Sequence, residues 1–325
     1  MEPELDLDRI RDARARLGDA ILTTPVLELT GAGAGVPPVL KLELFQVTGS
    51  FKPRGALLNV MALDEAQRAR GVCAVSGGNH AIATAYAASR LGTRARIVML
   101  ATASPLRAEQ CRAWGAEVEL AGTIHEAFER ADALSRAEGL SLIHPFEGLT
   151  TALGSATLGL ELVAQVPDLE AVVVPIGGGG LAAGVAAAVK QLRPGCKVYG
   201  VEPVGADTMR RSLEAGRPVG IEAVRTIADS LGAPYALPVS FGLCRRHLDD
   251  LVLVDDPALR TAMRYLLERA KLAVEPAGAA ATAAWLGPLR ERLAGRRVGL
   301  IVCGSNIDAA SFARLVAEDT NAQRK

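Results

Sequence analysis

Short runs of apolar and β-branched residues alternate along this chain with longer stretches of helix-forming residues, and this alternation constrains the fold most strongly. Such runs are typical of buried strands, and the stretches between them have apolar residues at helical spacing. The expected strands are Val39–Leu42, Val72–Val75, Ala95–Leu100, Glu117–Leu120, Ala171–Pro175, Lys197–Val201 and Val298–Val302. The expected helices include Ala81–Leu91, Leu181–Leu192 and Pro257–Arg269. Strands that alternate with helices form parallel sheets covered on both faces, so we predict an α/β protein.

The expected strands fall into two groups, which predict two lobes. The first group lies between residues 69 and 148 and is compact enough for a small βα domain. The second begins near Thr150 and continues along the rest of the sequence. A strand and a helix that begins at Lys52 precede the first group, and we expect them to pack with the second. The prediction is therefore a discontinuous large domain, 1–68 and 149–325, and a small domain, 69–148.

Composition and charge argue against several classes of function. The 36 basic and 36 acidic side chains balance, so we expect neither a nucleic-acid partner nor a polybasic membrane anchor. The most apolar stretch, Leu181–Val189, is too short to span a bilayer. The five cysteines include no CxxC pair, which is typical of reduced thiols. These features predict a cytoplasmic protein.

Lys52 has an unusual setting for a lysine. It lies in the segment Thr48-Gly49-Ser50-Phe51-Lys52-Pro53-Arg54-Gly55. Because proline suits the first turn of a helix, Pro53 would place Lys52 at a helix N-terminus. The positive end of the helix dipole lowers the pKa of an amine there and favours a neutral nucleophile. An isolated lysine is more often a surface residue, so this segment alone does not identify a nucleophile.

The loop Ser76-Gly77-Gly78-Asn79-His80 follows an expected strand and opens an expected helix. Small residues leave backbone N–H groups exposed there, and the helix dipole favours a carboxylate or a phosphate. Asn79 could donate an amide hydrogen bond to a ring oxygen. The alternative is an ordinary turn in which Asn79 caps the helix. We expect His80 to be a packed or capping residue rather than a general base.

A second loop contains four successive glycines, Gly177, Gly178, Gly179 and Gly180. Each glycine carries an entropic cost, so the run indicates a close backbone approach to an oxyanion, most naturally a phosphate. The loop also matches a dinucleotide fingerprint, because Ala183 takes the last position and Glu202 ends the next strand about twenty residues on. These residues alone leave both interpretations open.

Cys303 follows the last expected strand, in the segment Val302-Cys303-Gly304-Ser305-Asn306. Ligands of open parallel sheets bind at the carboxyl ends of the strands. The thiol is therefore either a buried structural group or a neutral hydrogen-bond partner for a ligand.

Together these segments resemble the serine/threonine dehydratase and serine racemase family of fold-type-II pyridoxal-phosphate enzymes. The resemblance covers nearly the whole chain. It rests, in order, on Lys41-Leu42-Glu43, Phe51-Lys52-x-Arg54-Gly55-Ala56, Ser76-x-Gly78-Asn79-His80, the four glycines, Val274-Glu275-Pro276-Ala277-Gly278 and Cys303-Gly304. It implies a two-domain fold like that of the tryptophan synthase β subunit, and a homodimer.

The resemblance also implies a role for each matching residue. It assigns the cofactor site to Phe51, Lys52, Asn79, Gly177, Gly178, Gly179, Gly180 and Cys303. Among these, Lys52 holds the cofactor as a Schiff base and removes the Cα proton, and Cys303 faces the pyridine nitrogen. The substrate carboxylate is assigned to the backbone of Ser76, Gly77, Gly78 and His80. A neutral thiol makes the ring a weaker electron sink, which favours prompt loss of a β leaving group.

The implied activity is the elimination of water from L-threonine or L-serine, giving a 2-oxo acid and ammonia. Gly77 stands where racemases of the family have a second serine, which argues against efficient racemisation. Glu202 and Ala206 match two ligands of the family's divalent-cation site, but Thr208 takes the acidic position. The segment Gly154-Ser155-Ala156-Thr157 replaces the usual Gly-Gln-Gly-Thr, which points to an altered entrance or substrate pocket.

Several alternatives stay open. A β-replacement enzyme of the cysteine-synthase type has threonine after the loop asparagine, so His80 favours dehydration. An NAD-dependent oxidoreductase would use the glycine loop and Glu202 but leaves Lys52 and Cys303 unexplained. A catalytically silent homologue that binds pyridoxal phosphate also stays open, although every matched cofactor position is chemically intact. The substrate stays open among serine, threonine and bulkier 3-hydroxy or 3-phenyl analogues of either configuration.

Overall fold

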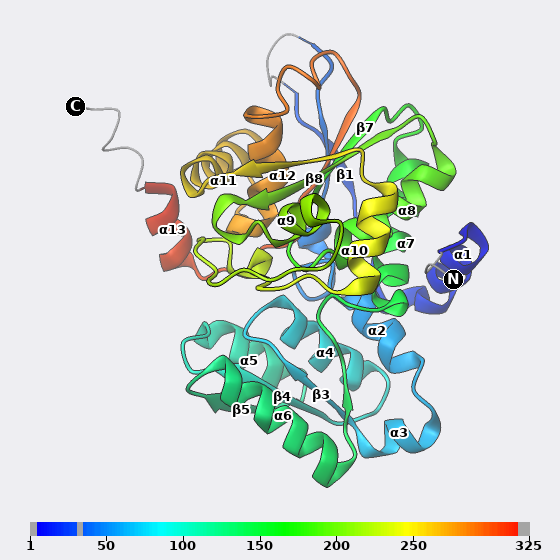
Figure 1. Ribbon diagram of the computed structural model, residues 1–325, viewed down its shortest axis with the longest axis vertical. Coiled ribbons are helices and arrows are strands. Elements are labelled where there is room, and N and C mark those ends of the chain that lie inside the picture. Colours follow the sequence, from blue (N-terminus) through cyan, green and yellow to red (C-terminus); the bar gives the residue numbers. More distant parts are fainter. Residues whose placement is uncertain (1–4, 31–34, 318–325) are drawn as a thin grey trace.

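The computed structural model describes residues 5–30 and 35–317, so the outer limits predicted for the large domain, residues 1 and 325, lie outside it. Within these ranges the strands form two sheets (Figure 1). The smaller sheet has the order β5-β4-β3-β6, and each neighbouring pair is parallel. Its strands are β3 (Val72–Val75), β4 (Ala95–Leu100), β5 (Glu117–Ala121) and β6 (Ser141–Leu142).

The larger sheet has the order β1-β2-β10-β7-β8-β9. All of its neighbouring pairs are parallel except β1 with β2 at one edge. Its strands are β1 (Val26–Glu28), β2 (Val39–Lys41), β7 (Ala171–Pro175), β8 (Lys197–Pro203), β9 (Asp250–Val254) and β10 (Val298–Ile301). The prediction of a parallel α/β protein is confirmed, with one antiparallel edge strand in addition.

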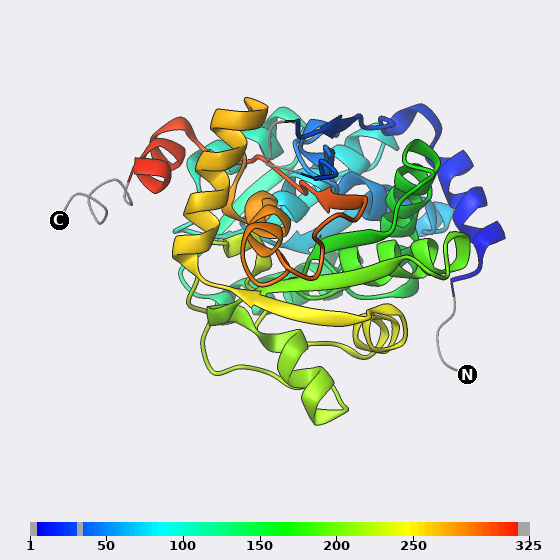
Figure 2. The ribbon, with the colours of Figure 1, turned by 90° about the horizontal axis from the view of Figure 1, so that it is seen from above.

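Helices connect the strands and pack around both sheets, and α1 and α13 lie at opposite ends of the molecule (Figure 2). Nowhere in the described ranges does a helix combine the length and the apolar character that a membrane crossing needs. The described α-helices are α1 (Leu7–Leu17), α2 (Pro53–Met61), α3 (Glu65–Arg70), α4 (Asn79–Arg90), α5 (Pro105–Ala113), α6 (Ile124–Glu138), α7 (Leu149–Gln165), α8 (Gly180–Leu192), α9 (Thr208–Ala215), α10 (Pro238–His247), α11 (Asp256–Ala270), α12 (Pro276–Leu286) and α13 (Ala309–Ala317). Short 3-10 helices are η1 (Gly18–Ala20), η2 (Glu43–Phe45), η3 (Val204–Ala206) and η4 (Asp229–Leu231).

The smaller sheet is covered on both faces. Cys73 and Val98 pack with Leu134 of α6 in a small core of their own. Ala74 and Ile97, their neighbours along the same strands, point to the opposite face and belong to the main core. Successive side chains of a strand point to opposite faces, so both faces of this sheet are apolar. We propose the lobes 69–148 and 1–68 with 149–325 on the basis of which residues supply each sheet.

The predicted strands and helices lie close to the observed ones. β3, β4 and β7 have the predicted bounds, and α4, α8 and α11 begin one or two residues before the predicted starts. The helix expected from Lys52 is α2, with Lys52 as its N-cap and Pro53 as its first residue. The sequence analysis missed β1, β6 and β9. β1 and β6 have only three and two residues, too few to form an apolar run.

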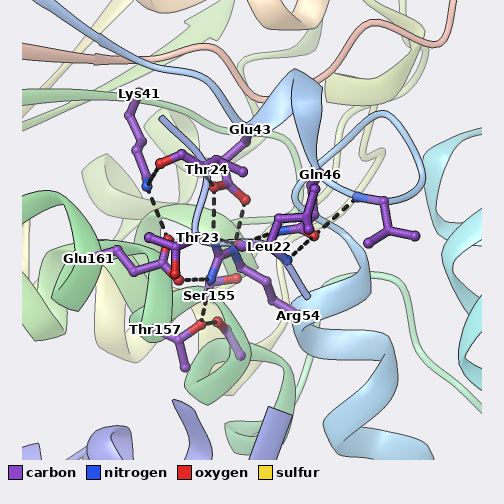
Figure 3. A network of polar contacts seen from close by, with 12 residues as sticks. Leu22, Thr23, Thr24, Lys41, Glu43, Gln46, Arg54, Ser155, Thr157 and Glu161 are labelled. Carbon is purple, nitrogen blue, oxygen red and sulfur yellow. Dashed lines mark hydrogen bonds and ion pairs between the residues drawn. The ribbon is translucent and has the colours of Figure 1, made fainter. Parts of the chain in front are cut away.

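A network of buried charges joins the N-terminal segment to α2 and α7 (Figure 3). The Arg54 guanidinium, in the first turn of α2, donates to both carboxylate oxygens of Glu43 at 2.7 and 2.9 Å. It also donates to both oxygens of Glu161 on α7, at 2.9 and 2.8 Å. The Lys41 ammonium donates to Glu161 at 3.0 Å and to the Thr24 carbonyl at 2.7 Å. Burial alone would lower the pKa of Arg54, but the two carboxylates raise it, so the side chain stays charged.

This network predicts a large effect of Arg54→Met on stability. The methionine fills similar space but leaves Glu43 and Glu161 buried without their cation, which costs about 3–5 kcal/mol of unfolding free energy. The matched control is Arg11→Met, because Arg11 forms an ion pair with Asp8 at the exposed surface. We expect the control to change the unfolding free energy by less than about 1 kcal/mol. Urea unfolding followed by far-UV circular dichroism compares the two, and equal effects would contradict the role of the network.

Candidate active site

The ends of α2 and β10 bring Lys52 and Cys303 together from distant parts of the chain. The Phe51 N–H donates to the Cys303 carbonyl at 3.1 Å. Ser50 and Gly304 form an antiparallel bridge beside this bond. The Lys52 segment is therefore fixed to the carboxyl end of β10, where ligands of parallel sheets bind.

The Lys52 amine lies in a partly buried position at the N-terminus of α2. Its Nζ donates to the Pro145 carbonyl at 2.5 Å and lies 5.1 Å from the centroid of the Phe51 ring. Burial lowers the pKa of Lys52 to about 8. The sequence analysis predicted a lowered pKa from the helix dipole, whereas burial is the larger cause here. A neutral amine is therefore accessible near neutral pH.

The four glycines form a cradle at the N-terminus of α8. Gly179 has a φ of +95°, which favours glycine. A Cβ atom on Gly178 would lie 2.1 Å from the Phe146 ring, and one on Gly180 would lie 2.4 Å from the Phe146 carbonyl oxygen. No larger residue fits at these positions without displacing Phe146. A cradle of bare backbone before a helix N-terminus fits the phosphate of a cofactor.

The loop before α4 leads into the first N–H groups of that helix, of which Ala81 donates to the Gly78 carbonyl at 3.0 Å and no side chain caps the others. Two N–H groups of the loop are occupied, because Ser76 donates to the Val98 carbonyl at 3.1 Å and Gly78 donates to the Ser76 hydroxyl at 3.2 Å. A Cβ atom on Gly77 would lie 2.9 Å from the Ala103 Cβ atom, so a serine at this position would be crowded. The loop therefore offers backbone donors to an anion but no second hydroxyl.

Asn79 is held by two buried polar side chains that the sequence analysis did not assign to the site. Its amide donates to Glu275 at 2.6 Å, and its carbonyl oxygen accepts from the Asn306 amide at 2.6 Å. Burial raises the pKa of Glu275 to about 7. The available signal was a carboxyl between two apolar residues, in Val274-Glu275-Pro276, and an amide shortly after a buried strand, at Asn306. Arg107, which also contacts Glu275, was missed as well.

His80 and Cys303 are both buried and neutral. The His80 ring nitrogen Nε2 lies 2.8 Å from the Ile143 carbonyl oxygen, and burial lowers the pKa of the ring to about 3. This ring is turned into the protein, as expected for a packed residue. Burial raises the pKa of the Cys303 thiol above its ordinary value. A neutral thiol is a suitable partner for an unprotonated pyridine nitrogen.

Glu202, which was predicted to bind a divalent cation, and Thr208, which takes the acidic position of that site, have other partners in the structure. Both carboxylate oxygens of Glu202 accept backbone N–H groups of α9, from Met209 and Arg210, at 2.8 Å each. The Thr208 hydroxyl donates to a backbone carbonyl at 2.7 Å. Among the described residues, no group of three or more His, Cys, Asp or Glu side chains could hold a metal ion. The ligand set of Glu202 and Ala206 stays a prediction that this geometry does not favour.

The buried His80 ring predicts a pH dependence of stability. Its pKa lies near 6.5 when exposed and near 3 in the folded protein. Its contribution is therefore fully present above pH 6.5 and is lost as the pH falls toward 3, by up to about 1.4 kcal/mol per pH unit. His80→Gln keeps an N–H donor for Ile143 but does not titrate. We expect Tm to fall more steeply below pH 6.5 in the wild type than in this variant, and parallel curves would contradict a buried neutral ring.

Comparison with known proteins agrees with this geometry. The model of the family described as "Pyridoxal-phosphate dependent enzyme" matches residues 17–304. The chain is 53% identical over 311 residues to phenylserine dehydratase of Ralstonia pickettii, with 95% of each chain covered. Among solved structures, a threonine deaminase of T.th. has a TM-score of 0.87 and 40% identity, over 94% of this chain and 99% of that one. Maize serine racemase has a TM-score of 0.89 and 34% identity, over 97% of this chain and 99% of that one.

These similarities confirm the predicted fold class, a two-domain fold-type-II arrangement, and leave the nicotinamide alternative without support. Family model, relatives and structural neighbours all extend over almost the whole chain and include both sheets. The chain belongs to the family of pyridoxal-phosphate dependent enzymes.

Proposed function

We propose that this chain is an ammonia-lyase that eliminates water from a β-hydroxy amino acid and releases a 2-oxo acid and ammonia. The observation that carries the proposal is the setting of the Lys52 amine. Its pKa is lowered to about 8, and it lies at the same site as the glycine cradle and the buried neutral thiol of Cys303. Relatives named as a dehydratase and a deaminase support this reaction class. The β-replacement alternative requires an added nucleophile, whereas the proposed reaction does not.

Each part of the site has a task in this proposal. When bound, pyridoxal phosphate supplies an electron-withdrawing ring in conjugation with the substrate amine. The backbone N–H groups at the start of α4 hold the substrate carboxylate and so orient the Cα–H bond. The Lys52 amine accepts the Cα proton, since its lowered pKa keeps a neutral fraction available. The β-hydroxyl leaves with a proton as water, and hydrolysis of the released enamine gives the 2-oxo acid and ammonia.

Release of 2-oxo acid without any added nucleophile tests the reaction. We expect the purified protein loaded with pyridoxal phosphate to release it from L-threonine, L-serine or L-threo-phenylserine. Lys52→Ala is expected to abolish the release, because it removes both the attachment point and the base. The control is Lys271→Ala, since Lys271 lies at the exposed C-terminal end of α11. After borohydride reduction, the cofactor should be found on the peptide that contains Lys52, and labelling of another lysine would overturn the assignment.

We further propose that the enzyme accepts a substrate with an aromatic group on the β-carbon. The carbonyl that accepts from the Lys52 amine belongs to Pro145, and the next residue is Phe146. The Phe146 ring lies 4.7 Å from the His144 ring and 6.3 Å from the Tyr235 ring, measured between centroids. These three rings form a cluster, here called the aromatic wall, that includes the residues on both sides of Pro145. The name of the Ralstonia pickettii relative, phenylserine dehydratase, supports the same choice.

The aromatic wall predicts a selective effect of Phe146→Leu. Loss of one ring–ring contact costs about 0.5–1.5 kcal/mol, so kcat/KM for L-threo-phenylserine should fall roughly 2- to 12-fold more than that for L-threonine. The absorbance of the bound cofactor serves as a control, because Phe146 also packs on Gly178. An equal fall for both substrates with full cofactor loading would contradict the proposed specificity.

The cellular setting is also a proposal. We infer a homodimer from the family resemblance alone. A cytoplasmic location is supported by the five cysteines, which are all free and buried. We expect the binding partner to be a small amino acid. The balanced charge argues against a nucleic-acid partner.

A further inference from the structure

Arg107 is a buried side chain that reaches from one lobe to several segments of the other. It lies on α5, which packs beside the smaller sheet, and only 7% of it is exposed. Its Nε donates to the Asn306 carbonyl at 3.0 Å. Its two terminal nitrogens donate to the Asp229 carboxylate at 2.5 and 3.4 Å. They also lie 3.5 Å from the Gly77 carbonyl oxygen and 3.5 Å from the Glu275 carboxylate.

These contacts belong to three parts of the candidate site. Gly77 is in the loop that presents the first N–H groups of α4. Asp229 begins η4, and a Cβ atom on Gly177 of the glycine cradle would lie 3.1 Å from the Cα atom of Leu231 in that helix. Glu275 accepts from the Asn79 amide. One guanidinium therefore fixes the relative positions of three parts of the site. These are the loop 76–80 (the anion loop), the η4 segment that packs against Gly177, and the cluster around Asn79.

The two acidic partners of Arg107 differ in exposure. The Glu275 side chain is buried, whereas 59% of the Asp229 side chain is exposed. A planar guanidinium can donate in several directions at once, and a lysine cannot reproduce this geometry. Asp229 can therefore be changed without leaving an unpaired carboxylate buried, and Glu275 then remains beside the guanidinium at 3.5 Å.

We propose that Arg107 is a positioning residue that holds the substrate loop of one lobe in register with the η4 segment of the other, mainly through Asp229. The proposal rests on the proposed function, because the loop that it positions is the one assigned to the substrate carboxylate. Arg107 acts through Gly77 and Asp229 and is not assigned contact with the reacting atoms. It is expected to affect amino-acid binding more than cofactor binding or the elimination step.

The test compares Arg107→Gln, Arg107→Lys and Asp229→Asn in the protein loaded with pyridoxal phosphate. Glycine is the binding probe, because it has an amine and a carboxylate but no β-hydroxyl to lose. Its Kd is measured from the change in the visible spectrum of the bound cofactor. We expect Arg107→Gln to raise the glycine Kd and the substrate KM roughly tenfold or more, with a smaller change in kcat. Arg107→Lys should recover only part of this loss.

A double-mutant cycle separates positioning from general stability. The effects of Arg107→Gln and Asp229→Asn on glycine Kd should be less than multiplicative when combined, because both remove the same ion pair. Arg264→Gln is the control, since Arg264 is a half-buried arginine that donates to the Val316 carbonyl on the far helices α11 and α13. It should leave glycine Kd unchanged.

Two results would overturn the proposal. One is an unchanged glycine Kd in Arg107→Gln with the cofactor fully bound. The other is a loss of Tm and cofactor affinity in this variant while the loaded fraction binds glycine as the wild type does, which would assign Arg107 a structural role only. If the wild type binds glycine but releases no 2-oxo acid from any hydroxy amino acid, the proposed reaction fails while the test of Arg107 stands.

Discussion

The site depends on the ion pairs that the buried Arg54 guanidinium forms with Glu43 and Glu161. The guanidinium joins η2, α2 and α7 through these two buried carboxylates, and Arg54 lies two residues after Lys52. Apolar side chains of similar volume in place of Arg54, Glu43 and Glu161 together would also fill this space, and often with equal stability. Apolar contacts have little directional preference, whereas a guanidinium that donates to two carboxylates permits few orientations of α2. We infer that the network fixes the direction in which the Lys52 amine leaves the helix.

The parallel sheets then bring the other groups to the same place. The glycine cradle follows β7, Cys303 follows β10 and the anion loop follows β3, each at the carboxyl end of its strand. A helix begins directly after two of these strands, so helix N-termini and strand ends meet in one region. The fold therefore supplies anion-binding backbone at two points, one suited to a phosphate and one to a carboxylate.

The sequence predicted the parts of this site that depend on local structure. Four consecutive glycines or a Lys-Pro pair at a helix start have a meaning within a few residues, and the structure places both at the site. Glu275, Asn306 and Arg107 could not be found in this way, because their roles depend on partners up to 227 residues away. The predicted cation ligands are the opposite case, because a sequence pattern predicted a site that the contacts in the structure do not favour. Glu202 matched a pattern, but the N–H groups of α9 occupy its carboxylate oxygens.

The arrangement of charge around Arg107 also has a consequence for substrate binding. A free guanidinium beside the anion loop would compete with the α4 backbone for the carboxylate of an amino acid, because a charge-assisted pair is stronger than a neutral hydrogen bond. Asp229 and Glu275 occupy its donors instead. In the proposed arrangement, the first turn of α4 is left as the anion site, and Arg107 orients it through the Gly77 carbonyl. A fixed carboxylate would determine which Cα–H bond faces Lys52, so we infer from the proposed arrangement that the ion pair contributes to stereochemical choice as well as to affinity.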